Sequence, residues 1–153
     1  MNPFRRPHTL ADVRRHRVKA ATVPGGRQPK GPTLMPSYGF LSTHPPTRCG
    51  LATFNSTLAA HLTADGTRGG IVRVIDRGGD QRAGPEVVHT WSTHGSAGWR
   101  DASDVLNTFD VVIVQHEYGI YPGADGEDVL PLLRCLKVPS IVVLHTVLRR
   151  PSA

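Results

Sequence analysis

The chain has 153 residues, a formal net charge of +6, and 39% hydrophobic and 6% aromatic residues. This length supports one domain with a substantial core, and no apolar run approaches the roughly 20 residues of a membrane-spanning helix. The arginines near the N-terminus are not followed by an apolar segment, as they would be in a secretory signal, so we expect a cytoplasmic protein without transmembrane segments.

The positive charge is concentrated at the N-terminus. Residues 1–35 hold eight lysines and arginines against one aspartate, whereas the rest of the chain has a net charge of −1. This segment lacks a sustained apolar pattern, so we predict a disordered basic tail that is dispensable for folding. Such an arm can contact phosphates or an anionic membrane surface, but the nearly neutral body argues against a nucleic-acid-binding protein. Met35 precedes the first predicted strand and is a candidate start of the biological chain.

A β-loop-α unit opens the body of the chain. The apolar run from Tyr38 to Leu41 predicts a strand, and two prolines at 45 and 46 interrupt it. Apolar residues then recur with helical spacing, which predicts a helix from Gly50 to Ala64. The predicted buried stripe of this helix is Leu51, Phe54, Leu58 and Leu62. A unit of this kind presents backbone N–H groups at the mouth of a sheet, where an anionic or sugar-bearing ligand can bind.

Strands and helices alternate along the rest of the chain. The predicted elements are strands at 70–76, 87–91, 110–115 and 140–144, with a short helix within 96–107 and another within 125–137. The run from Asp110 to Gln115 is apolar without alternation, which is typical of a strand covered on both faces of a parallel sheet. The pattern therefore predicts a doubly wound, mostly parallel α/β fold.

Polar residues follow several of these apolar strands directly. Ligands of an open parallel sheet bind beyond the carboxyl ends of its strands, which selects the loops at 43–50, 116–123 and 145–150. The side chains expected to share this edge of the sheet are His44, Arg48, His116, Glu117, His145 and Thr146. No second histidine stands four residues after His116, so the His-Glu pair does not predict a zinc protease site. Cys49 and Cys135 have neither zinc-binding nor disulfide-framework spacing.

Three segments also carry a family resemblance. They are Pro45-Pro46-Thr47-Arg48-Cys49-Gly50-Leu51-Ala52-Thr53-Phe54, Val114-Gln115-His116-Glu117-Tyr118-Gly119-Ile120 and Leu144-His145-Thr146-Val147. In this order they resemble the N-terminal, Rossmann-like domain of family 4 glycosyltransferases of the GT-B fold, over residues 36–153. The resemblance implies a retaining transfer of sugar from a nucleotide-sugar donor to an acceptor, without a metal or other cofactor.

The resemblance also implies roles for particular residues. His116 would be the catalytic residue that reaches the reacting sugar, and the loop at Gly50 would lie near the donor phosphates and sugar. The remaining candidate substrate-binding residues, from their place after the strands, are Arg48, Glu117, His145 and Thr146. The donor sugar, its nucleotide and the acceptor are left open.

The family's second domain, which supplies most nucleotide contacts, has no counterpart in this sequence. We therefore expect an incomplete first domain that is inactive alone, marginally stable and prone to associate through an uncovered sheet edge. The alternative is a non-catalytic α/β module that binds a nucleotide, an acceptor or a partner chain supplying the missing half.

Overall fold

A computed structural model of the protein describes residues 35–76, 83–94 and 98–149. In chain order its elements are β1 (Tyr38–Ser42), α1 (Gly50–Leu62), β2 (Gly69–Ile75), β3 (Val87–Ser92), α2 (Gly98–Leu106), β4 (Val111–His116), the short 3-10 helix η1 (Ala124–Gly126), α3 (Val129–Cys135) and β5 (Ser140–Leu144). Apart from Met35, the predicted basic tail lies outside the described residues. None of the described helices is long and apolar enough to cross a membrane.

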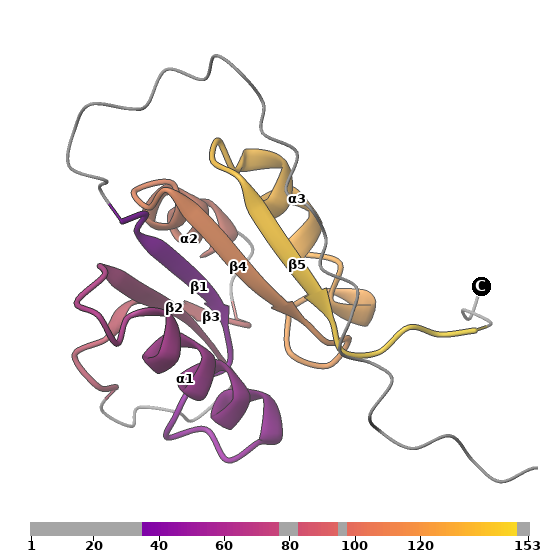
Figure 1. Ribbon diagram of the computed structural model, residues 1–153. Helices are drawn as coiled ribbons and strands as arrows, with labels where there is room; N and C mark the ends of the chain where they lie inside the picture. Colours follow the sequence, from indigo (N-terminus) through magenta and orange to yellow (C-terminus); the bar gives the residue numbers. More distant parts are fainter. Residues whose placement is uncertain (1–34, 77–82, 95–97, 150–153) are drawn as a thin grey trace, which may run out of the picture. The chain divides into compact units, whose positions relative to one another are not determined.

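The strands of the described part form one parallel sheet in the order β3-β2-β1-β4-β5 (Figure 1). The chain builds outward from β1 to β3, and then crosses to the other side of β1 to add β4 and β5. The direction of winding therefore reverses between β1 and β4. This is the doubly wound α/β architecture that the alternation of strands and helices predicted.

Helices cover both faces of the sheet (Figure 1). On one face, α1 packs through Ala59 onto Phe40 and Ile71. On the other face, α2 and α3 enclose a larger core that includes Trp91 and Leu106. Neighbouring residues of one strand belong to different cores because successive side chains of a strand point to opposite faces. The central strands are thus buried on both sides, as the unbroken apolar runs predicted.

The buried face of α1 differs from the predicted stripe. Ala52, Asn55 and Ala59 are buried, whereas Phe54 is 47% exposed. The two stripes lie one residue apart, about 100° around the helix, and apolar spacing alone does not distinguish them. The sheet buries the face with the smaller side chains. Of the predicted stripe, Leu58 and Leu62 pack against the same core partly buried, and Phe54 stays exposed. The helix also ends at Leu62, two residues before the predicted end.

The β5 strand lies at an edge of the sheet and pairs with β4 alone among the described strands. Its side chains are largely uncovered within the described residues: Ile141 is 55% exposed and Leu144 is 56% exposed. Within the part of the chain that the structure describes, β5 is therefore an uncovered apolar sheet edge of the kind that the sequence predicted.

Candidate functional site

Three loops meet at the carboxyl edge of the sheet around a shared pocket. Gly50 follows β1, Glu117 follows β4 and His145 follows β5. Together with Leu51 and Phe54 these residues line a cavity of about 380 Å³. Parallel strands bring their carboxyl ends to one edge, so residues far apart in sequence become neighbours. Half of the predicted site residues, Gly50, Glu117 and His145, thus line one pocket.

The loop between β1 and α1 is shaped by local hydrogen bonds. The Thr47 N–H donates to the His44 carbonyl at 3.1 Å, which closes a turn over the two prolines. Cys49 then caps α1, because its Sγ accepts the Ala52 N–H at 3.3 Å. The helix consequently starts at Gly50, with its amino end at the pocket.

Glu117 is held by its neighbours on both carboxylate oxygens. The Thr146 hydroxyl donates to Oε2 at 2.6 Å, and the Tyr118 N–H donates to Oε1 at 3.1 Å. The His145 N–H also donates to the His116 carbonyl at 3.0 Å, which joins the loops after β4 and β5. Thr146 thus acts on the pocket through Glu117, whose carboxylate can still accept hydrogen bonds from ligand hydroxyls.

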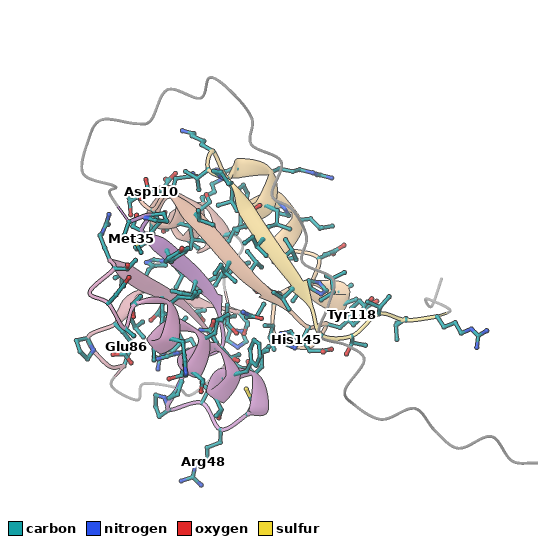
Figure 2. The ribbon with its side chains drawn as sticks, viewed as in Figure 1. Met35, Arg48, Glu86, Asp110, Tyr118 and His145 are labelled. Atoms are coloured by element: carbon teal, nitrogen blue, oxygen red, sulfur yellow. The ribbon has the colours of Figure 1, made fainter. Side chains whose placement is uncertain are left out.

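His145 is anchored to the core beneath it. Its Nε2 lies 2.8 Å from Oε1 of Gln115, a fully buried residue of β4. An amide oxygen only accepts hydrogen bonds, so Nε2 is the donor, and in this tautomer Nδ1 is the acceptor nitrogen. The imidazole also meets the Phe54 ring edge-on, with 5.3 Å between the ring centroids. Figure 2 shows His145 just beyond the end of β5.

His116 lies on the other side of β4 from this pocket. Its ring is 5.4 Å from the Tyr118 ring and 6.1 Å from the Tyr121 ring, centroid to centroid. Val112 and Val114 face the core under α2 and α3, and His116 continues that alternation while Gln115 faces α1. The His116 Nδ1 is buried and has no hydrogen-bond partner within the described residues. The His116 ring is thus not part of the pocket that Gly50, Glu117 and His145 line.

Tyr121 lies under His116. Its hydroxyl donates to the Gln115 carbonyl at 2.7 Å, and burial raises its pKa well above the ordinary value. Tyr121 therefore remains a neutral hydrogen-bond donor that supports the loop after β4.

Two further predicted edge residues lie away from the pocket. Arg48 is exposed and extends into solvent from the loop before α1 (Figure 2). His44 is 1% exposed, and its Nε2 lies 3.0 Å from the Glu86 carboxylate. A backbone hydrogen bond and then this imidazole contact keep the pKa of Glu86 below its usual value. His44 therefore stabilises the fold on the α1 side.

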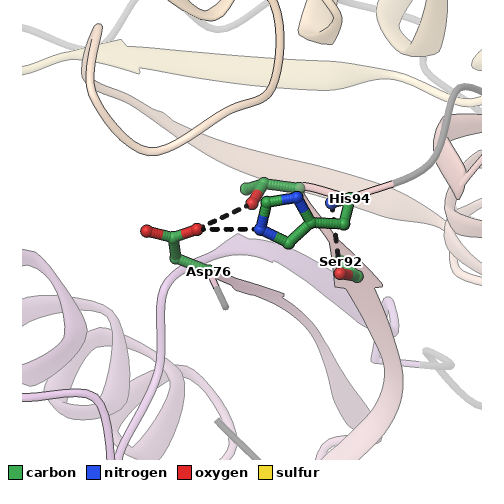
Figure 3. A network of polar contacts seen from close by, with 4 residues as sticks. Asp76, Ser92 and His94 are labelled. Carbon is green, nitrogen blue, oxygen red and sulfur yellow. Dashed lines mark hydrogen bonds and ion pairs between the residues drawn. The ribbon is translucent and has the colours of Figure 1, made fainter. Parts of the chain in front are cut away.

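A second cavity of about 400 Å³ lies at the same edge, over β1, β2 and the loop after β4. Its lining includes Thr43, Cys49, Asp76 and Thr93. The Asp76 Oδ1 accepts the Thr93 hydroxyl at 3.1 Å and lies 3.2 Å from the His94 Nε2 (Figure 3). We did not predict this cavity from sequence, although Asp76 and Thr93 also follow strands directly. The carboxyl-end rule, applied to β2 and β3 as well, would have found them.

The two cavities are adjacent along the sheet edge. In the loop before α1, Cys49 lines the second cavity and Gly50 lines the first. In the loop after β4, Gly119 lines the second cavity and Glu117 lines the first. The loop before α1 and the loop after β4 thus each contribute residues to both cavities. Within the described residues, no three His, Cys, Asp or Glu side chains are placed to hold a metal ion.

The chain matches no protein family model, no curated protein and no solved structure.

Proposed function

We propose that this chain is the N-terminal, Rossmann-like part of a retaining, nucleotide-sugar-dependent glycosyltransferase of the GT-B type. The supporting observation is the pocket that Gly50, Glu117 and His145 line at the carboxyl edge of a doubly wound parallel sheet. The three segments that resemble this family each supply one of these residues. The proposal covers binding of the donor by this chain, with catalysis requiring a second domain or a partner chain.

The chemistry of the transfer matches what the loops offer. The bond from the anomeric carbon to the diphosphate oxygen breaks and a bond to an acceptor hydroxyl oxygen forms. Negative charge develops on the departing diphosphate, which takes up the proton of that hydroxyl. The 13-residue helix α1 starts at Gly50, and its positive amino end favours that charge. Glu117 can accept hydrogen bonds from sugar hydroxyls, and His145 offers Nδ1 as a further acceptor.

One observation favours a second candidate, a non-catalytic binding module. The ring of His116, the residue that the resemblance assigns to catalysis, packs against Tyr118 and Tyr121 and is not part of the pocket lining. In this alternative the chain binds a nucleotide sugar or an acceptor and contributes no reacting group.

Binding is tested by saturation-transfer NMR on the full chain with UDP-glucose, UDP-N-acetylglucosamine and GDP-mannose. We expect at least one of them to receive saturation, and Glu117→Gln to weaken its binding about tenfold or more, as loss of a charged hydrogen-bond acceptor should. Asp104→Asn, an exposed carboxylate on α2, is the matched control. Absence of transfer to all three compounds would refute donor binding.

The catalytic and non-catalytic candidates are separated by His116→Ala in an assembly that includes a second domain. A glycosyltransferase should lose tenfold or more in turnover, within the range of a positioned polar group at a reacting site. Turnover equal to wild type would remove His116 from the mechanism. Unfolding curves of both proteins must agree for a loss of turnover to be assigned to chemistry.

A further inference from the structure

Phe54 has an unusual position for a large apolar side chain on an amphipathic helix. It lies in the first half of α1 and remains 47% exposed, although helical spacing predicted it in the core. Its ring lines the pocket beside Leu51 and Gly50. A half-exposed phenylalanine forgoes part of the free energy that its burial would provide. Its exposure at a pocket therefore points to contact with a ligand.

The Phe54 ring is held in place by a chain of contacts that reaches the core. It meets the His145 imidazole at 81°, with the centroids 5.3 Å apart. His145 in turn is hydrogen-bonded to the fully buried Gln115 at 2.8 Å. Because Gln115 is part of the central strand β4, the aromatic wall is preorganised, which lowers the entropic cost of binding.

Glu117 gives the pocket a charged side opposite in character to the apolar Phe54 ring, and the two together limit which ligands fit. Its carboxylate is negative, and none of the described residues that line the pocket is a lysine or arginine. A diphosphate would be repelled there, since like charges at short range are unfavourable. A neutral ring with an apolar face and hydroxyl groups at its rim would satisfy both the aromatic wall and the carboxylate. The volume, about 380 Å³, is within the range of small-molecule sites.

We propose that Phe54 is the stacking platform for a neutral pyranose ring, whose hydroxyl groups donate to Glu117. This inference rests on the proposed function for the ligand class. It adds a specificity-determining residue and separate positions for the sugar and the diphosphate. The pocket holds the sugar beside Phe54 and Glu117, and the diphosphate lies outside it, at the rim formed by the amino end of α1. The ring can belong to the nucleotide sugar or to a sugar acceptor, because both present the same chemistry.

The test titrates the full chain with methyl α-D-glucopyranoside, methyl α-D-mannopyranoside, UDP-glucose, GDP-mannose and choline, using saturation-transfer NMR. We expect Phe54→Ala to weaken binding of a methyl pyranoside about fivefold or more, and Phe54→Trp to keep it within about twofold. Leu130→Ala is the matched control, since Leu130 is 50% exposed on α3, which covers the other face of the sheet. Thermal unfolding of each variant reports whether the fold is retained.

The outcomes distinguish this inference from the proposed function. If Phe54→Ala weakens binding of UDP-glucose or GDP-mannose, the pyranose ring on Phe54 belongs to the donor. If it weakens binding of the methyl pyranosides alone, the ring belongs to an acceptor. Pyranoside binding without nucleotide-sugar binding supports the platform and refutes the donor function. Nucleotide-sugar binding that Phe54→Ala leaves unchanged, with no pyranoside bound, overturns the platform and spares the donor function. Three further outcomes also overturn the platform. They are equal losses of pyranoside affinity in Phe54→Ala and Leu130→Ala, binding of choline in place of the sugars, and no binding of any of these compounds.

Discussion

Asp110 and Ser37 join the starts of two central strands. The Asp110 carboxylate accepts the Ser37 N–H at 2.8 Å and the Ser37 hydroxyl at 2.6 Å, across 73 residues of sequence. The Asp110 N–H donates back to the Ser37 Oγ at 3.1 Å. The hydroxyl bond, followed by the backbone bond, lowers the pKa of Asp110 below its ordinary value of 3.8. The pair sets the register of β1 against β4 at the end of the sheet opposite the pocket.

The lowered pKa predicts how the Asp110 contribution depends on pH. Because the folded state favours the carboxylate, the stabilisation is present above pH 3.8 and is lost as the pH falls through the folded pKa. Asp110→Ala should therefore lower the Tm clearly at pH 7, and the difference from wild type should shrink at pH 3. Circular dichroism melts at both pH values check this, with Asp104→Ala as the control. A difference of equal size at both pH values would contradict the charge-assisted clamp.

Two glycines in neighbouring strands allow Phe109 to pack onto the sheet. Gly39 of β1 and Gly70 of β2 are neighbours in register. A Cβ at Gly70 would lie 2.5 Å from the Phe109 Cζ, and a Cβ at Gly39 would lie 2.9 Å from its Cδ2. The 4% exposed Phe109 ring occupies this space and completes the core at the amino end of the sheet.

Gly70→Ala should destabilise the fold by about 1–3 kcal/mol, because an added methyl group overpacks the site. Gly50→Ala is the control, since a Cβ at Gly50 meets nothing within 4 Å. Urea denaturation measures the free energy of unfolding of both variants. Combining Gly70→Ala with Phe109→Leu should recover part of the loss. If Gly70→Ala were as stable as Gly50→Ala, the close packing of Phe109 would not determine stability here.

At the scale of the whole described unit, the β5 edge determines how the protein behaves in solution. Val142 is 39% exposed and Ile141 is 55% exposed on a strand with no charged residue. An edge strand of this kind offers unpaired backbone groups together with apolar side chains, which favours association between chains. We therefore expect the chain to associate increasingly as its concentration rises.

Light scattering after size-exclusion chromatography at increasing concentration measures this association. Val142→Lys should suppress it, since a charge on an edge strand opposes strand pairing. Val88→Lys is the matched control, because Val88 is 49% exposed on β3 at the other edge of the sheet. A wild-type protein that stays monomeric at all concentrations would contradict the prediction, and equal suppression by both variants would show that association does not depend on the β5 edge in particular.

The sequence alone determined the order of elements and the edge of the sheet that carries the candidate site. Strands β1, β2, β4 and β5 begin and end within one residue of their predicted positions. Each consists of an apolar run ended by a local breaker or a polar residue, and such signals act over short distances along the chain. Parallel pairing then places Gly50, Glu117 and His145 at one edge, so their proximity followed from topology.

The tertiary structure alone decided where side chains point at that edge. The rotation of α1 onto Ala52 and Ala59 exposes Phe54, and the alternation along β4 turns His116 away from the pocket that holds Glu117. Both outcomes depend on how closely a helix approaches the sheet and on the face that a strand end presents. These are properties of packing between distant segments, and apolar spacing along the chain does not report them.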